Sequence, residues 1–128
     1  MPLAYRDGRP VLAAAYDRRV EEMKTVSIPE AVVNLPGPWE PQDLVTVNDA
    51  IVRVSRLEGE YDWHEHRDEE LFLCWDGTFR VEIDGGPSIQ LSPGDLLVVP
   101  AGTRHRVVAP SMAHTVLVER PQTKARGD

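Results

Sequence analysis

The sequence has little of what several classes of protein require. Cys74 is its one cysteine among 128 residues, which excludes a disulfide within the chain and favours a cytoplasmic location. Lys and Arg number 14 against 21 Asp and Glu, for a formal charge of −7, so the basic face that binds nucleic acid is missing. No apolar run approaches the roughly 18 residues of a membrane helix. The N-terminal residues lack the apolar segment of a secretory signal. We therefore expect no nucleic-acid partner and no membrane insertion.

What the chain does contain suits one soluble globular domain. Hydrophobic residues make up 41% and charged residues 27% of the sequence, and 128 residues are enough to bury a core. The 11 prolines and 9 glycines are spread along the chain, a pattern typical of many short strands joined by turns.

The first third of the chain differs from the rest in its residue pattern and in the secondary structure that this pattern predicts. Residues 11–24 carry apolar side chains at helical spacing and predict a helix within an N-terminal extension over residues 1–28. Met23 is also a plausible translation start, so residues 1–22 stay open as an addition outside the core fold. Residues 29–43 hold four prolines and predict an extended arm without long regular structure.

From residue 44 onward the chain reads as short β-strands between turn signals. Asp76-Gly77 is a strong signal for a two-residue hairpin turn. With no helix between the strands, the pattern predicts an antiparallel sandwich or small barrel over residues 44–120, followed by a tail at 121–128. Nine strands are expected, with the sequences LVTVN, AIVRVSRL, YDWHEH, ELFLCW, TFRVEI, SIQL, LLVVP, RHRVVA and HTVLVE.

Two histidines in the run WHEH indicate a metal site. On a strand, His64 and His66 point to one face, while Trp63 and Glu65 point to the other. Glu70 opens the next strand and can bring a carboxylate to the same ion. His105 lies far away in sequence and would join the other three through closure of the barrel.

Three imidazoles and one carboxylate form a mixed nitrogen and oxygen donor set. It suits one divalent first-row transition metal per chain, of which Fe, Mn, Ni, Cu, Co and Zn are candidates, rather than Ca or Mg. A His-x-His pair on a surface strand beside acids is equally typical of solvated histidine, so the residues alone leave both interpretations open.

The residues around these ligands resemble the two motifs of the cupin superfamily. The first motif matches as Gly59, four residues, His64-x-His66, three residues, Glu70, six residues and Gly77. The second matches as Gly94, five residues, Pro100-x-Gly102, two residues and His105, with Ala109 where the family has asparagine. The gap after Gly59 is also one residue shorter than the commonest form. Small single-domain bacterial cupins are similar to the whole of residues 44–120.

The resemblance implies an all-β fold, a double-stranded β-helix (jelly-roll) cupin barrel with a short N-terminal helix or arm. It also implies one metal in the barrel mouth, held at His64, His66, Glu70 and His105, and a homodimer in which an N-terminal segment lies against the partner. The departure at Ala109 removes a polar group near the site but no metal ligand.

Several residues outside the four proposed ligands also have expected roles. His114 is expected to be structural or exposed, and Arg53 to be a solvated charge. Cys74 is expected to be a buried inert thiol, with oxidation near a redox metal as the alternative. For Asp62, a role beside the metal ligands and a role in the turn both stay open.

Trp63 and Trp75 have the parity opposite to that of the ligands. We therefore expect both to face outward, in an interface or in outer packing.

Two classes of function remain. The first is a metalloenzyme that acts on a small organic metabolite, with oxygenase-type oxidoreductase chemistry slightly favoured over isomerase, lyase or decarboxylase chemistry. The second is a non-catalytic cupin that binds or senses a small molecule. No residue clearly supplies a separate acid or base, and the fold does not decide between the two classes.

Overall fold

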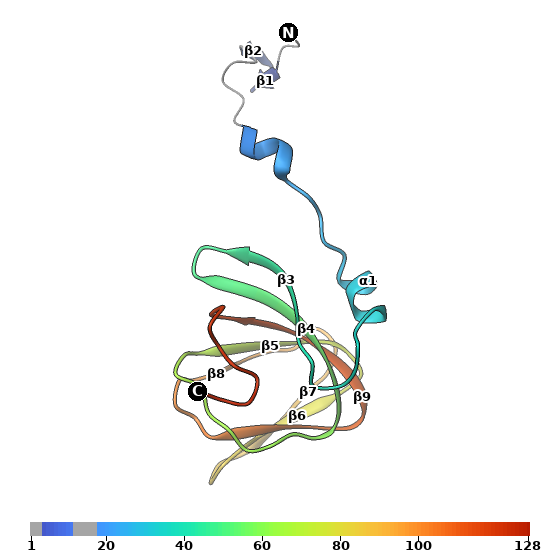
Figure 1. Cartoon of the computed structure of the whole chain (residues 1–128), viewed down its shortest axis with the longest axis vertical. Helices are drawn as coiled ribbons and strands as arrows, with labels where there is room; N and C mark the ends of the chain where they lie inside the picture. The colour runs from blue at the N-terminus through green and yellow to red at the C-terminus, as the bar shows by residue number, and fades with distance from the viewer. Residues whose placement is uncertain (1–3, 12–17) are drawn as a thin grey trace.

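The computed structural model describes residues 4–11 and 18–128, and its body is one seven-stranded antiparallel sheet that closes on itself (Figure 1). The strands of this body are β3 (Gln42–Val47), β4 (Ala50–Glu60), β5 (Glu70–Asp76), β6 (Phe79–Ile83), β7 (Ser88–Leu91), β8 (Leu96–Val99) and β9 (His105–Glu119).

Strand β9 joins the two halves of the barrel. Its first four residues, His105 to Val108, pair with β6, which also pairs with β7. Its later residues pair with β4 on one side and β5 on the other, within the order β3-β4-β9-β5-β8. One strand shared by both layers gives the jelly-roll architecture that the sequence predicts.

The core lies between the two layers and is built from alternate residues of the strands. Strand β5 places Phe72 and Cys74 inward, and β6 places Phe79 and Val81 inward, because successive side chains of a strand point to opposite faces. These four side chains are at most 3% exposed. The remaining buried members of the core are Leu57, Leu91, Val99, Val107, Ala109, Ala113 and Leu117.

Two of the nine strand predictions differ from the structure. Residues 61–69 lie outside the strands apart from a single bridge, so YDWHEH is a loop. The runs RHRVVA and HTVLVE form one strand, β9, although Pro110 stands between them. The register against β4 shifts from Leu57–Ala113 to Gly59–Ala109, so a bulge accommodates the proline, which has no N–H to donate.

The Asp76-Gly77 turn does not make the predicted hairpin. Strand β5 pairs with β8 and β9, and β6 pairs with β7 and β9, so the turn carries the chain from one layer to the other. Gly77 has φ +68°, and a Cβ there would lie 2.8 Å from the carbonyl oxygen of Met112. Close approach to β9 therefore requires glycine at this position.

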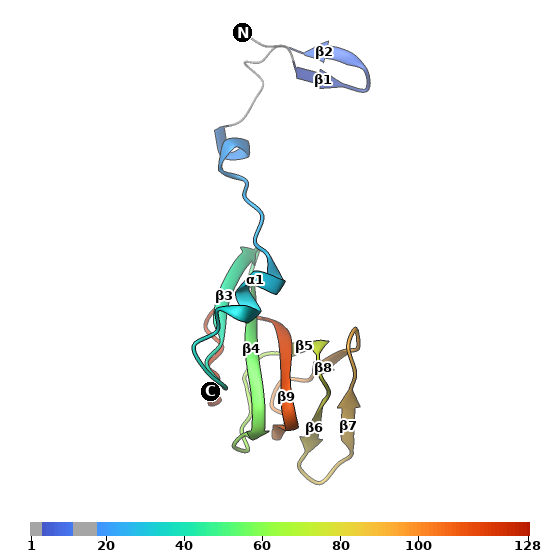
Figure 2. The same cartoon turned by 90° about the vertical axis from the view of Figure 1, so that its right-hand side faces the viewer.

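The N-terminal segment departs from the predicted helix. Of residues 11–24, Val11 ends strand β2 (Arg9–Val11), which pairs with β1 (Ala4–Arg6), and η2 (Arg18–Glu22) is a 3₁₀ helix. Residues 12–17 lie outside the described residues. Figure 2 shows η2 standing away from the barrel.

A short helix, α1 (Ile28–Val33), occupies the start of the proline-rich arm. Ser27 caps it by accepting a hydrogen bond from the backbone N–H of Glu30 at 3.3 Å, and Pro29 lies in the first turn, where its missing N–H costs nothing. No helix among the described residues is long and apolar enough to cross a membrane.

Candidate metal centre

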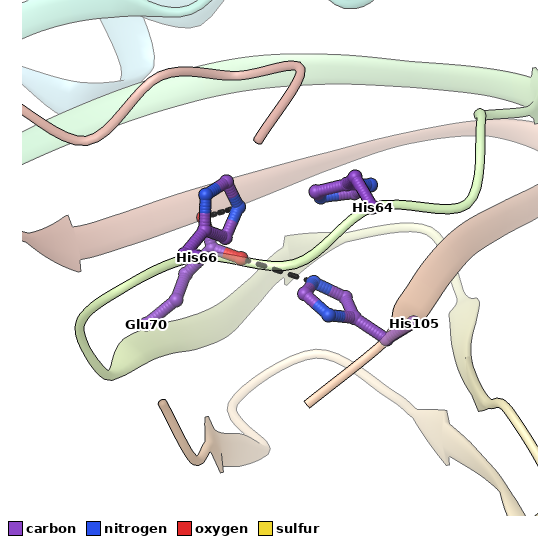
Figure 3. Close-up of side chains that lie close together, drawn as sticks. All are labelled: His64, His66, Glu70 and His105. Atoms are coloured by element: carbon purple, nitrogen blue, oxygen red, sulfur yellow. Dashed lines mark ion pairs between the residues drawn. The ribbon is translucent and has the colours of Figure 1, made fainter. Parts of the chain in front are cut away.

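Four side chains from three segments meet at one end of the barrel. His64 and His66 come from the loop over residues 61–69, Glu70 begins β5, and His105 begins β9. One ligand atom of each lies within 4.8 Å of the other three, and the side chains point toward one another in Figure 3. The structure thus brings together all four residues that the sequence singled out.

Backbone hydrogen bonds fix the histidine loop in place. The N–H of His64 donates to the carbonyl of His105, and the N–H of His105 donates back to His64, both at 2.9 Å. Gly102 donates to the carbonyl of His66 at 2.8 Å. The single β-bridge between His64 and His105 makes successive side chains of the loop point to opposite sides, as in a strand. His64 and His66 are therefore buried and Glu65 is exposed, although the loop is not a strand.

Two of the histidine rings are held through Nδ1. The Nδ1 of His64 lies 2.8 Å from the carbonyl oxygen of Asp62, and the Nδ1 of His105 lies 2.7 Å from that of Thr103. A carbonyl oxygen only accepts, so each Nδ1 carries the proton and each Nε2 presents a lone pair. Asp62 thus supports the site through its backbone, while its side chain is exposed.

Glu70 lies between the Nε2 atoms of His66 and His105. Its carboxylate oxygens are each 3.5 Å from an Nε2, one of His66 and one of His105. Burial acts to raise the pKa of Glu70, but its contacts with His105, Glu119 and the imidazole of His66 outweigh burial and lower that pKa. Burial lowers the pKa of His64, which keeps the ring neutral and able to bind a cation.

The buried polar atoms of the site lack hydrogen-bond partners. Both ring nitrogens of His66, the Nε2 of His105 and the Oε1 of Glu70 are buried without one within the described residues. Buried polar atoms are normally satisfied, and a metal ion satisfies lone pairs of this kind. The donor set and its unpaired atoms therefore fit a transition metal.

Glu119 is a site residue that the sequence analysis missed. It is 7% exposed, contacts Glu70, and accepts a hydrogen bond from Arg53 at 2.7 Å. Burial first, and then the proximity of Glu70, raise the pKa of Glu119 to about 8. One feature of the sequence could have indicated it: Glu119 ends an apolar strand and stands two residues after Leu117, so both side chains point to the same, inward face.

Arg53 is not the solvated charge that was expected. Its guanidinium also pairs with Asp43 at 2.8 Å and donates to the carbonyls of Pro121 and Thr123 at 2.7 and 3.1 Å. This side chain therefore links β4 to the C-terminal tail and holds Glu119 in place.

A small chamber of about 50 Å³ lies beside the ligands inside the barrel. Trp39 and Tyr61, whose ring centroids are 4.8 Å apart, form part of its wall, and Ala125 of the tail also lines it. The other lining residues are Pro41, Ser55, Leu57, His64, Glu70, Phe72, Val107, Thr115, Leu117 and Glu119. The chamber is mostly apolar, with its two acids on the ligand side.

The remaining predicted residues lie outside the ligand set. His114 is buried and its Nδ1 lies 2.6 Å from a carboxylate oxygen of Asp76, so it is structural. Cys74 is buried, and burial raises the pKa of its thiol, which makes it unreactive as expected. Trp75 is 36% exposed, and Trp63 packs against the guanidinium of Arg106 at 4.9 Å from its ring centroid.

Comparison with known proteins identifies relatives of this chain. The family described as Cupin_2, cupin domain, matches residues 51–119. The uncharacterized protein YdbB of Bacillus subtilis is 35% identical over 79 residues, which cover 61% of this chain and 70% of that protein. A cupin-2 domain containing protein from Shewanella frigidimarina is similar in structure, with a TM-score of 0.71, 26% identity, and coverage of 74% of this chain and 93% of that one.

An enzyme is also among the relatives. Acireductone dioxygenase 1 of Coprinopsis cinerea is 34% identical over 76 residues, which cover 53% of this chain and 43% of the enzyme. The chain therefore spans less than half the length of this dioxygenase.

Proposed function

Because this chain belongs to the Cupin_2 family, whose cupin domain matches more than half of its residues, we propose that it is a metal-binding cupin. It holds one divalent first-row transition metal per chain through His64, His66, Glu70 and His105. The observation that carries the proposal is the convergence of four buried ligand atoms within 4.8 Å, several of them without a hydrogen-bond partner.

The chain's own residues suit this role chemically. Carbonyls orient the rings of His64 and His105 so that each Nε2 lone pair faces the cluster. Glu70 supplies the negative charge that balances a divalent cation, and its lowered pKa keeps it ionised. A metal in such a mixed donor set polarises a bound oxygen atom or reacts with dioxygen, depending on its identity.

We propose that the activity is oxidation of a small organic metabolite, of the dioxygenase type. The chamber beside the ligands is mostly apolar, which suits dioxygen. Glu119 is the acid in the chamber wall besides Glu70, and it is the group placed to accept or return a proton. The similarity to an acireductone dioxygenase supports the same class of reaction.

The test separates metal identity from turnover. Metal-free protein is loaded in turn with Fe, Mn, Ni, Co, Cu or Zn, and oxygen consumption is followed with an acireductone and a panel of small enediols and oxo acids. Metal-dependent oxygen uptake with stoichiometric product is expected for at least one ion. Binding of less than one metal per chain for every ion contradicts the metal site, and substrate consumption that is equal under argon contradicts the oxygenase.

A second candidate is a cupin that binds or senses a small molecule without turnover. The small volume of the chamber and the aromatic side chains of Trp39 and Tyr61 in its wall favour this candidate, because they suit the capture of a small ligand. Saturable binding of a metabolite to the loaded protein, with the metabolite recovered unchanged in air, would establish it.

The proposal includes a cytoplasmic homodimer. The outer face of the sheet supports association, because registered pairs align apolar side chains into two rows across its strands. One row consists of Val45, Val52, Val118, Leu71 and Val98, and the other of Val54, Val116, Leu73 and Leu96. Val54 and Val116 are buried within the chain itself, whereas Leu96 is 65% exposed and Val98 46% exposed, so the open part of this face around β8 is a surface on which a second copy can bury apolar area.

A further inference from the structure

One ligand histidine differs from the other two. His64 and His105 each donate through Nδ1 to a backbone carbonyl, at 2.8 and 2.7 Å. His66 is only 4% exposed, so water has little access to its ring. Its Nδ1 is buried and has no hydrogen-bond partner among the described residues. A histidine that binds a metal through one nitrogen almost always donates the other N–H to a carboxylate or carbonyl. His66 therefore needs an acceptor.

A carboxylate of the C-terminal tail lies nearby. The Oδ2 of Asp128 is 3.8 Å from the Nδ1 of His66, while the Nε2 of the same ring faces Glu70. An N–H···O⁻ hydrogen bond needs about 2.8 Å, so a movement of about 1 Å closes the gap. The side chain of Asp128 has the charge and the position that the outer nitrogen of His66 requires.

The tail is built to hold this carboxylate over the site. The backbone N–H groups of Arg67 and Lys124 donate to the side chain of Asp128, at 3.3 and 3.2 Å. The backbone N–H of Asp128 donates to the carbonyl of Glu65 at 3.0 Å. Gly127 lies so close to the histidine loop that a Cβ there would be 2.8 Å from the carbonyl oxygen of Glu65. Three of these contacts attach the tail to the loop that carries His64 and His66, and the hydrogen bond from Lys124 lies within the tail.

The same tail also forms part of the wall of the chamber beside the ligands. Arg53 holds the carbonyls of Pro121 and Thr123, and Ala125 forms part of the chamber wall. The tail therefore contacts the metal centre at Asp128 and the chamber at Ala125.

We propose that Asp128 is the outer hydrogen-bond partner of His66, and that metal loading therefore draws the tail closed over the site. The inference rests on the proposed metal binding and adds a positioning residue outside the four ligands. Asp128 orients the ring of His66 and fixes the proton on Nδ1, which leaves Nε2 free to bind the metal.

The experiment titrates the metal-free full chain with Co(II) and follows its visible absorption. Asp128→Ala is expected to weaken Co(II) affinity by about 10–100-fold, the usual effect of losing an outer partner. Asp128→Asn keeps a side-chain carbonyl that accepts a hydrogen bond, so it is expected to recover most of the lost affinity. Asp49→Ala removes an exposed acid from the turn between β3 and β4, and as a matched control it is expected to bind like the wild type.

A second measurement tests the coupling to the tail. Co(II) is expected to slow hydrogen exchange at the backbone N–H groups of Lys124, Gly127 and Asp128 in the wild type and in Asp128→Asn, but not in Asp128→Ala. A purely structural role for Asp128 would change tail exchange equally with and without metal.

The outcomes separate this inference from the proposed function. Equal Co(II) affinity of Asp128→Ala and Asp49→Ala overturns the inference and leaves the metal site intact. A wild type that binds no Co(II) overturns both. A wild type that binds Co(II) but consumes no substrate contradicts only the oxygenase activity, because the affinity ratio decides the role of Asp128.

Discussion

At the scale of single residues, the metal centre depends on how each imidazole is held. Two rings are fixed by carbonyls two residues earlier in the chain, those of Asp62 and Thr103. These contacts are local, so the segments that carry the ligands also orient them. For the third ring, that of His66, the proposed partner is Asp128, whose carboxylate lies 3.8 Å away and is brought there only by the folded chain.

His105 is the proposed ligand that comes from the second motif, and its removal is predicted to abolish tight metal binding. His105→Ala is expected to lower metal affinity by more than the 10–100-fold typical of an outer partner, because a donor atom itself is lost. Asp62→Ala is the matched control, since Asp62 contributes its backbone carbonyl, and it is expected to bind metal normally. Competition titration against a chelator measures both, and equal affinities would exclude His105 as a ligand.

Glu119 is predicted to give the metal-free protein a pH-dependent stability. Its pKa is raised from the ordinary 4.5 to about 8 in the folded state, so between these values the folded protein binds more protons than the unfolded chain. The free energy of unfolding should therefore fall as pH rises from about 4.5 to about 8. Urea denaturation across this range checks the slope.

The matching variant for this effect is Glu119→Gln, which keeps the shape and cannot ionise. Its free energy of unfolding is expected to fall less steeply over the same range, and an identical slope would assign the effect to another group. The lowered pKa of Glu70 acts in the opposite sense. Its contribution to the free energy of unfolding is present above the ordinary glutamate pKa of 4.5 and is lost as the pH falls below that value.

At the scale of elements, β9 decides how the barrel closes. It is 15 residues long and pairs with β6, β4 and β5, so it brings His105 to the histidine loop and Glu119 to Glu70. The bulge around Pro110 lets one strand serve both layers. The short contact between Gly77 and β9 at this bulge keeps the connection from β5 to β6 tight.

Gly77→Ala is therefore predicted to destabilise the barrel more than Gly85→Ala. Both glycines have positive φ, of +68° and +70°, so an added Cβ costs each about 1–2 kcal/mol of backbone strain. At Gly77 the Cβ also meets Met112 and Ala113 at 2.8 Å, which adds about 1–3 kcal/mol of overpacking, whereas at Gly85 nothing lies within 4 Å. Urea denaturation of both variants measures the difference, and equal losses would contradict the clash.

At the scale of the whole molecule, the apolar outer face of the sheet bears on assembly. One cross-strand row is continuous over five strands and the other over four, and the end of each row on β8 is open to solvent. Strands β3 and β8 are the two ends of the order β3-β4-β9-β5-β8, so the face extends across this sheet.

Leu96→Glu is predicted to convert the proposed dimer to a monomer, because it places a charge in an apolar interface. Met112→Glu is the control, since Met112 is 51% exposed in the bulge of β9, outside both rows. Light scattering coupled to size-exclusion chromatography measures the mass. A wild type that is monomeric at all concentrations contradicts the dimer.

Local patterns in the sequence predicted much of the fold and all four candidate ligands. Alternation predicted the inward residues of β5 and β6, and motif spacing selected His64, His66, Glu70 and His105. The same patterns failed where long-range pairing overrides local signals. Asp76-Gly77 reads as a hairpin turn but links two layers, and Pro110 reads as a break but lies in a bulge.

The sequence by itself determined the donor chemistry, because three imidazoles and a carboxylate at these spacings favour a transition metal whatever surrounds them. Only the tertiary structure decided what surrounds the donors. Glu119 is 49 residues from Glu70 and Asp128 is 62 residues from His66 in the numbering of the chain. Periodicity carries information over a few residues, whereas the contacts of these acids depend on the register of β9 and the path of the tail. Closure of the barrel sets both.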